Sequence, residues 1–470
     1  MSSVITDPRR QKLLLGAVAL GVVMDGVDGA IVNVALPTMA AYFATDTGTI
    51  AWVIITYLLM MAGLMLVFGK FAERGLAKKI FLLGFAIFTL ASLACGLAPT
   101  LNVLLAARLA QGAGAAMIAA VAPLLFVRHL PPGMLAMALG VLATTSSIGF
   151  AVGPAIGGVF TQYFSWHWIF LINLPIGIAG ILFAARVIPE DEPEECPTPF
   201  DYPGAVLLFI AMALVTFVLE EGLKRGISDP LITGCIALGI FSLALFVLRE
   251  LTVSGPLINI RIFLSGAFSA VLVAYMLMNV VFMGIIYLLP FYLTTMMAYD
   301  PAATGLCLLV PPAAIALLSI PFGKWSDRSG RRAFAVVATG VMIVYSVLFA
   351  FLVPESGVLP LLSGLVLIGI SVGIFSGPAA SRVIESAPEG EQGTGSSLMV
   401  TTIYFGAVLG TAIYATIFTI TTMQSGMIVP FADLDGAAFL SGFHLTVAAG
   451  VVLAVIALVL SAVVPDLKRA

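Results

Sequence analysis

The chain has 470 residues, of which 61% are hydrophobic and only 10% are charged, against about 25% charged residues in a typical soluble domain. Because the chain has too few polar side chains to cover a folded apolar core in water, its composition excludes a water-soluble protein. It favours a multi-pass protein of the plasma membrane, whereas the net charge of −3 alone excludes little.

Apolar runs long enough to cross a bilayer as helices, which takes about 20 residues, recur along the whole chain. Strands are excluded for such runs, because their backbone groups would face lipid without hydrogen-bond partners. We expect fourteen transmembrane helices, at 13–36, 50–68, 80–98, 101–125, 135–160, 166–186, 202–219, 230–248, 267–297, 302–322, 333–353, 358–380, 394–420 and 442–464. The first of these has no signal cleavage site after it and is expected to remain in the mature protein.

Lysine and arginine set the orientation of these helices, because cytoplasmic loops carry an excess of both. With the N-terminus inside, every basic residue but three falls in a cytoplasmic segment. Lys224 and Arg225 fall outside the cell, and Arg108 falls within a helix. An odd number of crossings would scatter this pattern, so both termini are expected to be cytoplasmic.

Two segments repeat within the chain at nearly the same offset. GKFAER at 69–74 recurs as GKWSDR at 323–328, and ATTSSIGFAVG at 143–153 recurs as VTTIYFGAVLG at 400–410. One duplication explains both, mapping the first six helices onto the last six and leaving the seventh and eighth as an insert. Such repeats are typical of transporters whose substrate binds near the bilayer midplane, between the repeats.

Both copies of the repeated loop place an acid directly before an arginine. Ordinary cytoplasmic positive charge explains the basic residues but not this shared pair. An acid–arginine pair could latch neighbouring helix ends and interact with a helix dipole. We therefore expect gating loops that contain Gly69, Glu73, Arg74, Gly323, Asp327 and Arg328.

These loops resemble the signature loop of the major facilitator superfamily, which reads roughly G-x-L-a-D-R-x-G-R-[KR]. The second copy matches well. The first copy departs from it at Glu73, Leu76 and Ala77, so a weaker latch is expected in the N-terminal half.

Four other segments resemble the fourteen-helix drug:H+ antiporter branch of that superfamily. They are MDGVDGAIVNVALP (24–37), RLAQGAGAA (108–116), GFAVGPAIGG (149–158) and WHWIFLINLPIG (166–177). The resemblance implies an all-α major facilitator fold with two six-helix bundles, 1–189 and 261–470. An acidic linker and the two inserted helices, 190–260, would join them.

The third of these segments resembles the antiporter motif, which comprises Gly149, Gly153, Pro154, Gly157 and Gly158. Glycines four residues apart share one helix face and permit close approach of another helix. The proline removes a helix hydrogen bond and favours a kink. Simple packing and control of which side opens both remain open as roles.

Only Asp25, Asp28 and Arg108 lie clearly within the hydrocarbon region, where an ionised side chain is costly and functional roles are the default. Counted at 1.5 Å per residue, Asp28 and Arg108 lie at similar depths and are expected to form an ion pair. Asp25 and Asp28 are i,i+3 neighbours, and close carboxylates resist double ionisation. We expect these three residues to handle protons, with Asp25 as the carrier; a purely structural ion pair is the alternative.

The expected cavity combines this acidic group with aromatic residues of the C-terminal half, which suits a lipophilic cation, although for any single aromatic the helix core is the favoured alternative. The candidate substrate contacts are Asp25, Asn33, Tyr57, Tyr275, Asn279, Phe282, Tyr287, Tyr292, Tyr404 and Tyr414. Three acids near the ends of the seventh helix, Asp201, Glu220 and Glu221, are expected at the membrane interface.

The leading hypothesis is a proton-coupled multidrug exporter for hydrophobic, cationic compounds that works by alternating access as a monomer. A uniporter or symporter of a metabolite or amphiphile is the alternative, and a non-transporting sensor is more remote. No catalytic motif suggests an enzyme. The scattered cysteines, Cys95, Cys196, Cys235 and Cys307, suggest neither a metal site nor disulfides, and we expect no cofactor and no nucleic-acid partner.

Overall fold

The computed structural model describes residues 4–191, 200–253, 255–388, 390–424 and 427–464. Within these ranges every regular element is a helix and no strand is formed. The all-α fold expected from the sequence is therefore confirmed, as lipid requires, since each helix satisfies its own backbone hydrogen bonds.

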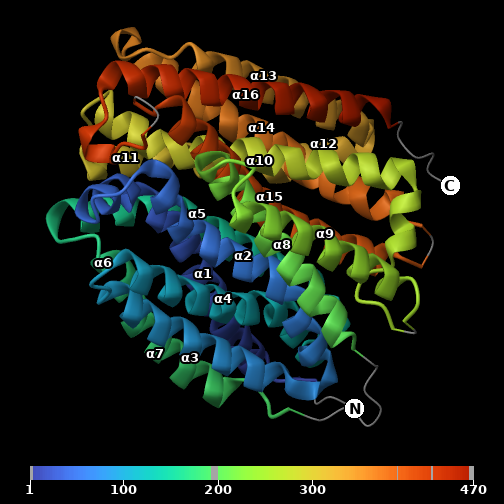
Figure 1. The fold of residues 1–470 in the computed structure, drawn as a ribbon. Coiled ribbons are helices and arrows are strands. Elements are labelled where there is room, and N and C mark those ends of the chain that lie inside the picture. The colour runs from blue at the N-terminus through green and yellow to red at the C-terminus, as the bar shows by residue number, and fades with distance from the viewer. Residues whose placement is uncertain (1–3, 192–199, 254, 389, 425–426, 465–470) are drawn as a thin grey trace.

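The helices fall into an N-terminal half, an insert and a C-terminal half (Figure 1). The N-terminal half contains α1 (Pro8–Tyr42), α2 (Thr47–Phe71), the short turn η1 (Ala72–Leu76), α3 (Ala77–Gly96), α4 (Leu101–His129), η2 (Pro132–Met134), α5 (Leu135–Tyr163), α6 (Trp168–Leu171) and α7 (Asn173–Val187). The insert contains α8 (Tyr202–Arg225) and α9 (Pro230–Glu250). The C-terminal half contains η3 (Ile260–Leu264), α10 (Gly266–Thr295), α11 (Pro301–Leu308), α12 (Val310–Ser329), α13 (Arg331–Ala350), η4 (Pro354–Ser356), α14 (Val358–Ser386), α15 (Gln392–Thr421), η5 (Phe431–Asp433) and α16 (Gly436–Val463).

By length and hydropathy, 13 helical segments of the described chain could cross a membrane. One of them, Thr47–Gly96, has 50 residues and contains a break at Gly75, whose φ is 85°. This left-handed conformation favours glycine and separates α2 from α3. Each expected range lies mostly within helix, but the count of fourteen crossings stays a prediction.

The two halves repeat the same helix packing, as the internal sequence repeat predicts. In the N-terminal half α1 packs on α5 and α7, and α4 packs on α2 and α3. In the C-terminal half α10 packs on α15 and α16, and α14 packs on α12 and α13. The internal repeat is therefore structural as well as sequential.

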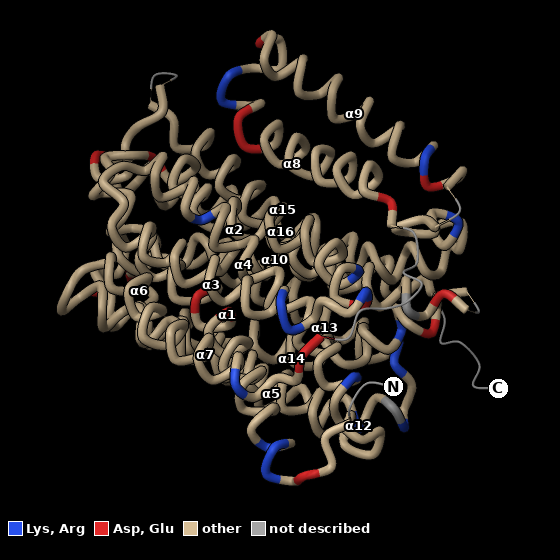
Figure 2. Tube along the Cα trace, turned by 90° about the horizontal axis from the view of Figure 1, so that it is seen from below, with Lys and Arg blue, Asp and Glu red and all other residues tan. Residues whose placement is uncertain are grey.

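Charged residues gather in the loops and at the helix ends (Figure 2). The two ends of the bundle differ in how many lysines and arginines they carry. We assign the end with most of the lysine and arginine to the cytoplasm. There a cavity of about 580 Å³ opens between the halves, lined by residues of α2, α4 and α15. At the opposite, external end α2 meets α15 and α5 meets α11. The structure is thus open to the cytoplasm and closed to the outside.

The inserted helices lie at the edge of the molecule, where α8 contacts α2 and α15 and α9 packs on α8 (Figure 2). The outer side of α9 is apolar and exposed, including Ile240, Phe241, Leu243, Leu245 and Leu248. Lipid tails are as apolar as these side chains, so this surface suits contact with the bilayer.

Candidate functional site

Glycines hold the helix that carries both candidate aspartates against α5. A Cβ atom at Gly153 would lie 2.9 Å from the carbonyl oxygen of Val27, and one at Gly149 would lie 2.8 Å from that of Val23. Such distances leave no room for a side chain, so α1 and α5 touch through their backbones. The repeat-related Gly410 of α15 meets the Val280 carbonyl of α10 in the same way. The antiporter motif therefore fixes the position of α1.

Asp28 and Arg108 form the ion pair expected from their depth. Arg108 Nη1 lies 2.6 Å from Asp28 Oδ2, and the two side chains are 1% and 0% exposed. Both charges are removed from water, so the pair needs further hydrogen bonds to be stable.

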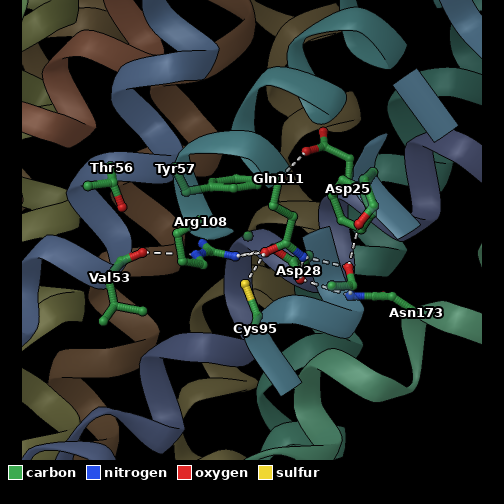
Figure 3. Close-up of polar contacts among 12 residues, drawn as sticks. Asp25, Asp28, Val53, Thr56, Tyr57, Cys95, Arg108, Gln111 and Asn173 are labelled. Atoms are coloured by element: carbon green, nitrogen blue, oxygen red, sulfur yellow. Dashed lines mark hydrogen bonds and ion pairs between the residues drawn. The ribbon is translucent and has the colours of Figure 1, made fainter. Parts of the chain in front are cut away.

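Two neutral side chains, Gln111 and Asn173, supply those bonds (Figure 3). Gln111 Nε2 and Asn173 Nδ2 donate to Asp28 Oδ1 at 2.8 and 2.9 Å. Gln111 Nε2 also donates to Ser92 Oγ, and Gln111 Oε1 accepts from Arg108. The Asp28 carboxylate thus accepts three hydrogen bonds, one from Arg108 and two from neutral amides. Sequence reasoning missed Gln111 and Asn173 as site residues, although both stand in the motifs that carry the family resemblance.

The remaining contacts of Arg108 come from α2 and α6. Its Nε donates to the carbonyl oxygen of Val53 at 2.9 Å. Its guanidinium carbon lies 4.2 Å from the centre of the Tyr57 ring and 5.7 Å from that of Phe170, within reach of a cation–π interaction. Arg108 therefore links α4 to α1 and α2 at once.

Asp25 stands apart from this closed network. It is only partly buried, and its Oδ1 accepts a hydrogen bond of 2.6 Å from the hydroxyl of Tyr57. Tyr57 thus contacts both the free aspartate, through its hydroxyl, and Arg108, through its ring (Figure 3). The arrangement offers one sequestered carboxylate and one that can still exchange partners.

Among the predicted substrate contacts of the C-terminal half, Tyr404 of α15 lies within electrostatic range of Asp25, and three others lie along α10 between residues 275 and 282. Tyr404 is partly exposed. On α10, Asn279 is partly exposed and bonds to the carbonyl of Tyr275, whose ring lies 5.5 Å from that of Phe375. Phe282, also on α10, is 8% exposed.

Other predicted contacts lie elsewhere, and no strongly polar face on α10 or α15 indicated in the sequence which side faces the cavity. Tyr414 is wedged between Gly284 and Gly450, and the ring of Tyr292 packs 4.7 Å from that of Phe443. Both are fully buried inside the C-terminal bundle and offer no surface to a substrate between the halves. Tyr287 instead crosses to the N-terminal half at the closed end, donating to the Thr47 carbonyl.

Asn33, the last of the predicted contacts, is 2% exposed. Its amide bonds weakly to the Gly29 carbonyl of its own helix, at 3.5 Å. In this conformation it is closed off from the cavity.

The first gating loop does not form a pair between its own acid and arginine. Glu73 pairs with Lys70 at 2.9 Å, both about half exposed, and Arg74 bonds to the hydroxyl of Tyr202 on α8 at 3.1 Å. Arg128 at the end of α4 donates to the Glu73 carbonyl. The loop thus joins α2, α4 and α8, and Gly69 and Glu73 line the cytoplasmic cavity.

The second gating loop cannot be tested for its acid–arginine pair, because the side chain of Asp327 lies outside the described residues. Arg328 is exposed, and the backbone of Gly323 approaches Gly377 of α14. In the same region Arg331 pairs with Glu385 of α14. Salt bridges here therefore connect α13 to α14.

The end of the antiporter motif lies at the closed external end, where α5 of the N-terminal half meets α11 of the C-terminal half. A Cβ atom at Gly158 would lie 2.3 Å from the carbonyl oxygen of Pro301, and one at Gly305 the same distance from that of Pro154. The motif therefore contacts α1 through one face and α11 of the opposite half through its end.

The beginning of the acidic linker contacts the start of α3, although the Glu190 side chain stays 87% exposed. Asp191 accepts from the backbone N–H groups of Lys78 and Lys79 at the start of α3, a favourable place for an anion. Glu190 pairs with the Lys78 ammonium at 2.7 Å. The hydrogen bond and charge of Lys78 lower the pKa of Glu190 from its ordinary value. Cys196 and the rest of the expected linker to residue 199 lie outside the described residues.

Two of the acids expected at the membrane interface are buried instead. The side chain of Asp201 is fully buried and pairs with Arg249 at 2.6 Å. Glu220 is also fully buried and pairs with Lys224 at 2.6 Å. Their positions close to the ends of α8 suggested that they would be exposed, but packing of α8 against α9 and α15 covers them. Glu221 is 18% exposed.

Comparison with known proteins gives a consistent family. The model described as Major Facilitator Superfamily matches residues 18–411. The chain is 30% identical over 410 residues to the riboflavin transporter RibZ of Clostridioides difficile, covering 87% of this chain and 89% of that protein. It is also 30% identical to the multidrug resistance protein Stp of Mycobacterium tuberculosis, over 87% of this chain and 76% of Stp.

A further relative is the putative multidrug resistance protein MdtD of Salmonella paratyphi B, 34% identical over 64% of each chain. Among solved structures, a bacterial homolog of the human lysosomal transporter Spinster, in an inward-facing and unoccupied conformation, gives a TM-score of 0.69. The alignment covers 99% of this chain and 100% of that one at 16% identity, which supports the fold alone.

Proposed function

The chain belongs to the major facilitator superfamily, a family of membrane transporters, and from this premise we propose that it exports hydrophobic, cationic compounds in exchange for protons. The observation that carries the proposal is the contrast between two aspartates one helical turn apart. Asp28 is enclosed by donors, whereas Asp25 is partly exposed and bound by Tyr57 alone.

This contrast is our reason for proposing Asp25 as the proton carrier. Asp28 accepts from Arg108, Gln111 and Asn173, and protonating it would break at least one charge-assisted bond in a site without water. Asp25 accepts one bond from a neutral phenol and can gain or lose a proton without breaking an ion pair. A carboxylate with this freedom is what proton exchange needs.

A cationic substrate would then compete with the proton for the same carboxylate. Tyr57 of the N-terminal half bonds to Asp25, and Tyr404 of the C-terminal half is within its electrostatic range; aromatic faces attract cations within about 6 Å. Protonation of Asp25 from outside would release the cation, and loss of the proton to the cytoplasm would restore the site. Each ligand favours the conformation that binds it more tightly, as alternating access requires.

Transport of a metabolite without drug export is the second candidate. It is favoured by the similarity to the riboflavin transporter RibZ, which covers 89% of that protein. Under this alternative the same fold would move riboflavin or another metabolite as a uniporter or symporter.

Transport into proteoliposomes under an imposed pH gradient separates the two candidates. A quaternary ammonium dye is offered in one set and riboflavin in another, with wild type, Asp25→Asn and the exposed-site control Glu355→Gln. We expect gradient-driven dye movement by wild type and the control, and none by Asp25→Asn. Dye movement that ignores the gradient, or survives fully in Asp25→Asn, would overturn the proposal; movement of riboflavin alone would favour the alternative.

A further inference from the structure

A second ion pair is buried near the external end of the inserted helix α8, far along the chain from the proposed proton site. Glu220 and Lys224 are one helical turn apart, with Oε1 and Nζ separated by 2.6 Å and side chains 0% and 4% exposed. Neither residue takes part in the proposed proton exchange. A buried ion pair carries a desolvation penalty, so its place in the molecule needs a reason.

The pair lies where the two halves meet at the closed external end. From the C-terminal half, the Thr416 hydroxyl of α15 lies 2.8 Å from Glu220 Oε2. From the N-terminal half, the backbone of α2 closes over the pair at Gly48. A Cβ atom there would lie 2.6 Å from Glu220 Oε1, 2.7 Å from Lys224 Nζ and 2.7 Å from Thr419 Oγ1. The inserted helix therefore contacts both halves at one point.

The other charges around the pair are few. Lys224 also lies 3.4 Å from Glu221 of the same helix and is influenced by Asp46, which caps α2. Arg225 is 48% exposed and pairs with Glu221. The groups facing the pair from α15 are hydroxyls, and the Tyr287 phenol of α10 is within electrostatic range of Glu220. Glu220 is therefore the main counter-charge of Lys224 while the external end is closed.

Opening the outside must separate α2 from α15 and admit water to the pair. In the closed state Lys224 without Glu220, or Glu220 without Lys224, would be a buried charge lacking its partner. In the open state water would solvate either charge. Loss of one partner therefore disfavours the closed state selectively, while an intact pair is compatible with closure.

We infer that Glu220 and Lys224 are positioning residues of the external gate, through which the inserted helix α8 holds α2 and α15 together when the outside is closed. The inference rests on the proposed function only in assuming that the two ends open alternately. It assigns the insert a part in the transport cycle, beyond joining the two bundles.

The test measures the external opening directly, without substrate or proton gradient. Spin labels are placed on cysteines substituted at Leu97 and Phe351, exposed residues at the external ends of α3 and α13. The background lacks the four native cysteines and is first shown to fold. Pulsed electron–electron double resonance on the full chain in nanodiscs then gives the populations of short (closed) and long (open) distances.

We expect Glu220→Gln and Lys224→Gln each to raise the open-to-closed ratio at least tenfold, which corresponds to about 1.4 kcal/mol. The charge-swapped double variant, Glu220→Lys with Lys224→Glu, should restore most of the closed population. Arg225→Gln, an exposed charge on the same turn, is the matched control and should leave the ratio unchanged. Gly48→Leu leaves both charged residues in the sequence but would place a side chain of α2 against them, and it should also open the contact between α2 and α15.

Distances unchanged in both single variants and in Gly48→Leu would overturn the inference. So would lower thermal stability of the single variants with the same distance populations, because that pattern indicates a merely structural pair. An equal shift in Arg225→Gln would show a general effect of charge removal and would also contradict it. Failure of dye transport leaves these distances unaffected, so the two proposals can fail separately.

Discussion

Replacing Asp28 by asparagine removes the counter-charge of Arg108 with almost no change in shape. The carboxylate accepts Arg108 on one oxygen and both Gln111 and Asn173 on the other. An amide keeps one acceptor and presents a donor on the other side, so either the guanidinium or two amides lose their partner. Hydrogen bonds to charged groups contribute about 1.5–3 kcal/mol, and breaking a buried ion pair costs about 3–5 kcal/mol. We expect the free energy of unfolding to fall by about 3–5 kcal/mol.

Asp25→Asn provides the contrast, since its amide oxygen can still accept from Tyr57 and its surroundings are partly exposed. There we expect a loss of about 1 kcal/mol or less. Thermal unfolding of both variants in detergent, followed by intrinsic fluorescence, should place Asp28→Asn clearly below Asp25→Asn. Adding Arg108→Gln to Asp28→Asn should recover part of the loss. Equal melting temperatures for the two single variants would refute the assignment of one sequestered and one free carboxylate.

Three further substitutions test other parts of the site. Tyr57→Phe keeps the ring over Arg108 but removes the hydrogen bond to Asp25. Proton-driven dye transport should therefore fall several-fold while the melting temperature stays near that of wild type. A large drop in melting temperature would contradict the idea that this hydrogen bond serves transport rather than stability. Arg108→Lys keeps the charge but not the planar guanidinium that reaches several acceptors, and we expect the rate of dye transport to fall below a tenth of wild type. A wild-type rate in this variant would show that the several hydrogen bonds of Arg108 are not needed for transport. Gly158→Leu would collide with the Pro301 carbonyl, so labels at the external helix ends should report a more open outside, and an unchanged distance would exclude this contact as part of the seal.

Much of the fold follows from the sequence because bilayer thickness fixes helix length and basic loops fix orientation. The Asp28–Arg108 pair was predictable for a similar reason, since residues counted from two helix ends give comparable depths. Depth alone does not give the rotation of each helix about its axis. Gln111 and Asn173 were therefore missed, although Gln111 is three residues from Arg108 and must share its face.

The errors on the C-terminal side have the same origin. Tyr292 and Tyr414 are aromatic residues on helices that bury every face, so no polar side marks which of them line the cavity. Glu220 was expected at the interface because it lies near the end of α8, but the neighbours that bury it belong to α2 and α15, distant in sequence. Contacts between the two halves are the part of the structure that patterns within one helix do not reveal.

Helix α2 runs from the closed external end of the protein to the cytoplasmic cavity. Gly48 lies at the closed end, Tyr57 near its middle contacts both Asp25 and Arg108, and Gly69 near its other end lines the cytoplasmic cavity. At 1.5 Å per residue, Gly48 lies about 14 Å and Gly69 about 18 Å from Tyr57. A rigid tilt of about 10° around Tyr57 would move these ends roughly 2 Å and 3 Å in opposite directions.

Distance labels at both ends of α2, each paired with a label on α15, would show such a tilt as one distance lengthening while the other shortens. Changes of the same sign at both ends would rule it out. With Tyr57, next to the proposed protonation site, as the pivot, one rigid helix would open one gate as it closes the other, and no separate signal between the two gates would be required.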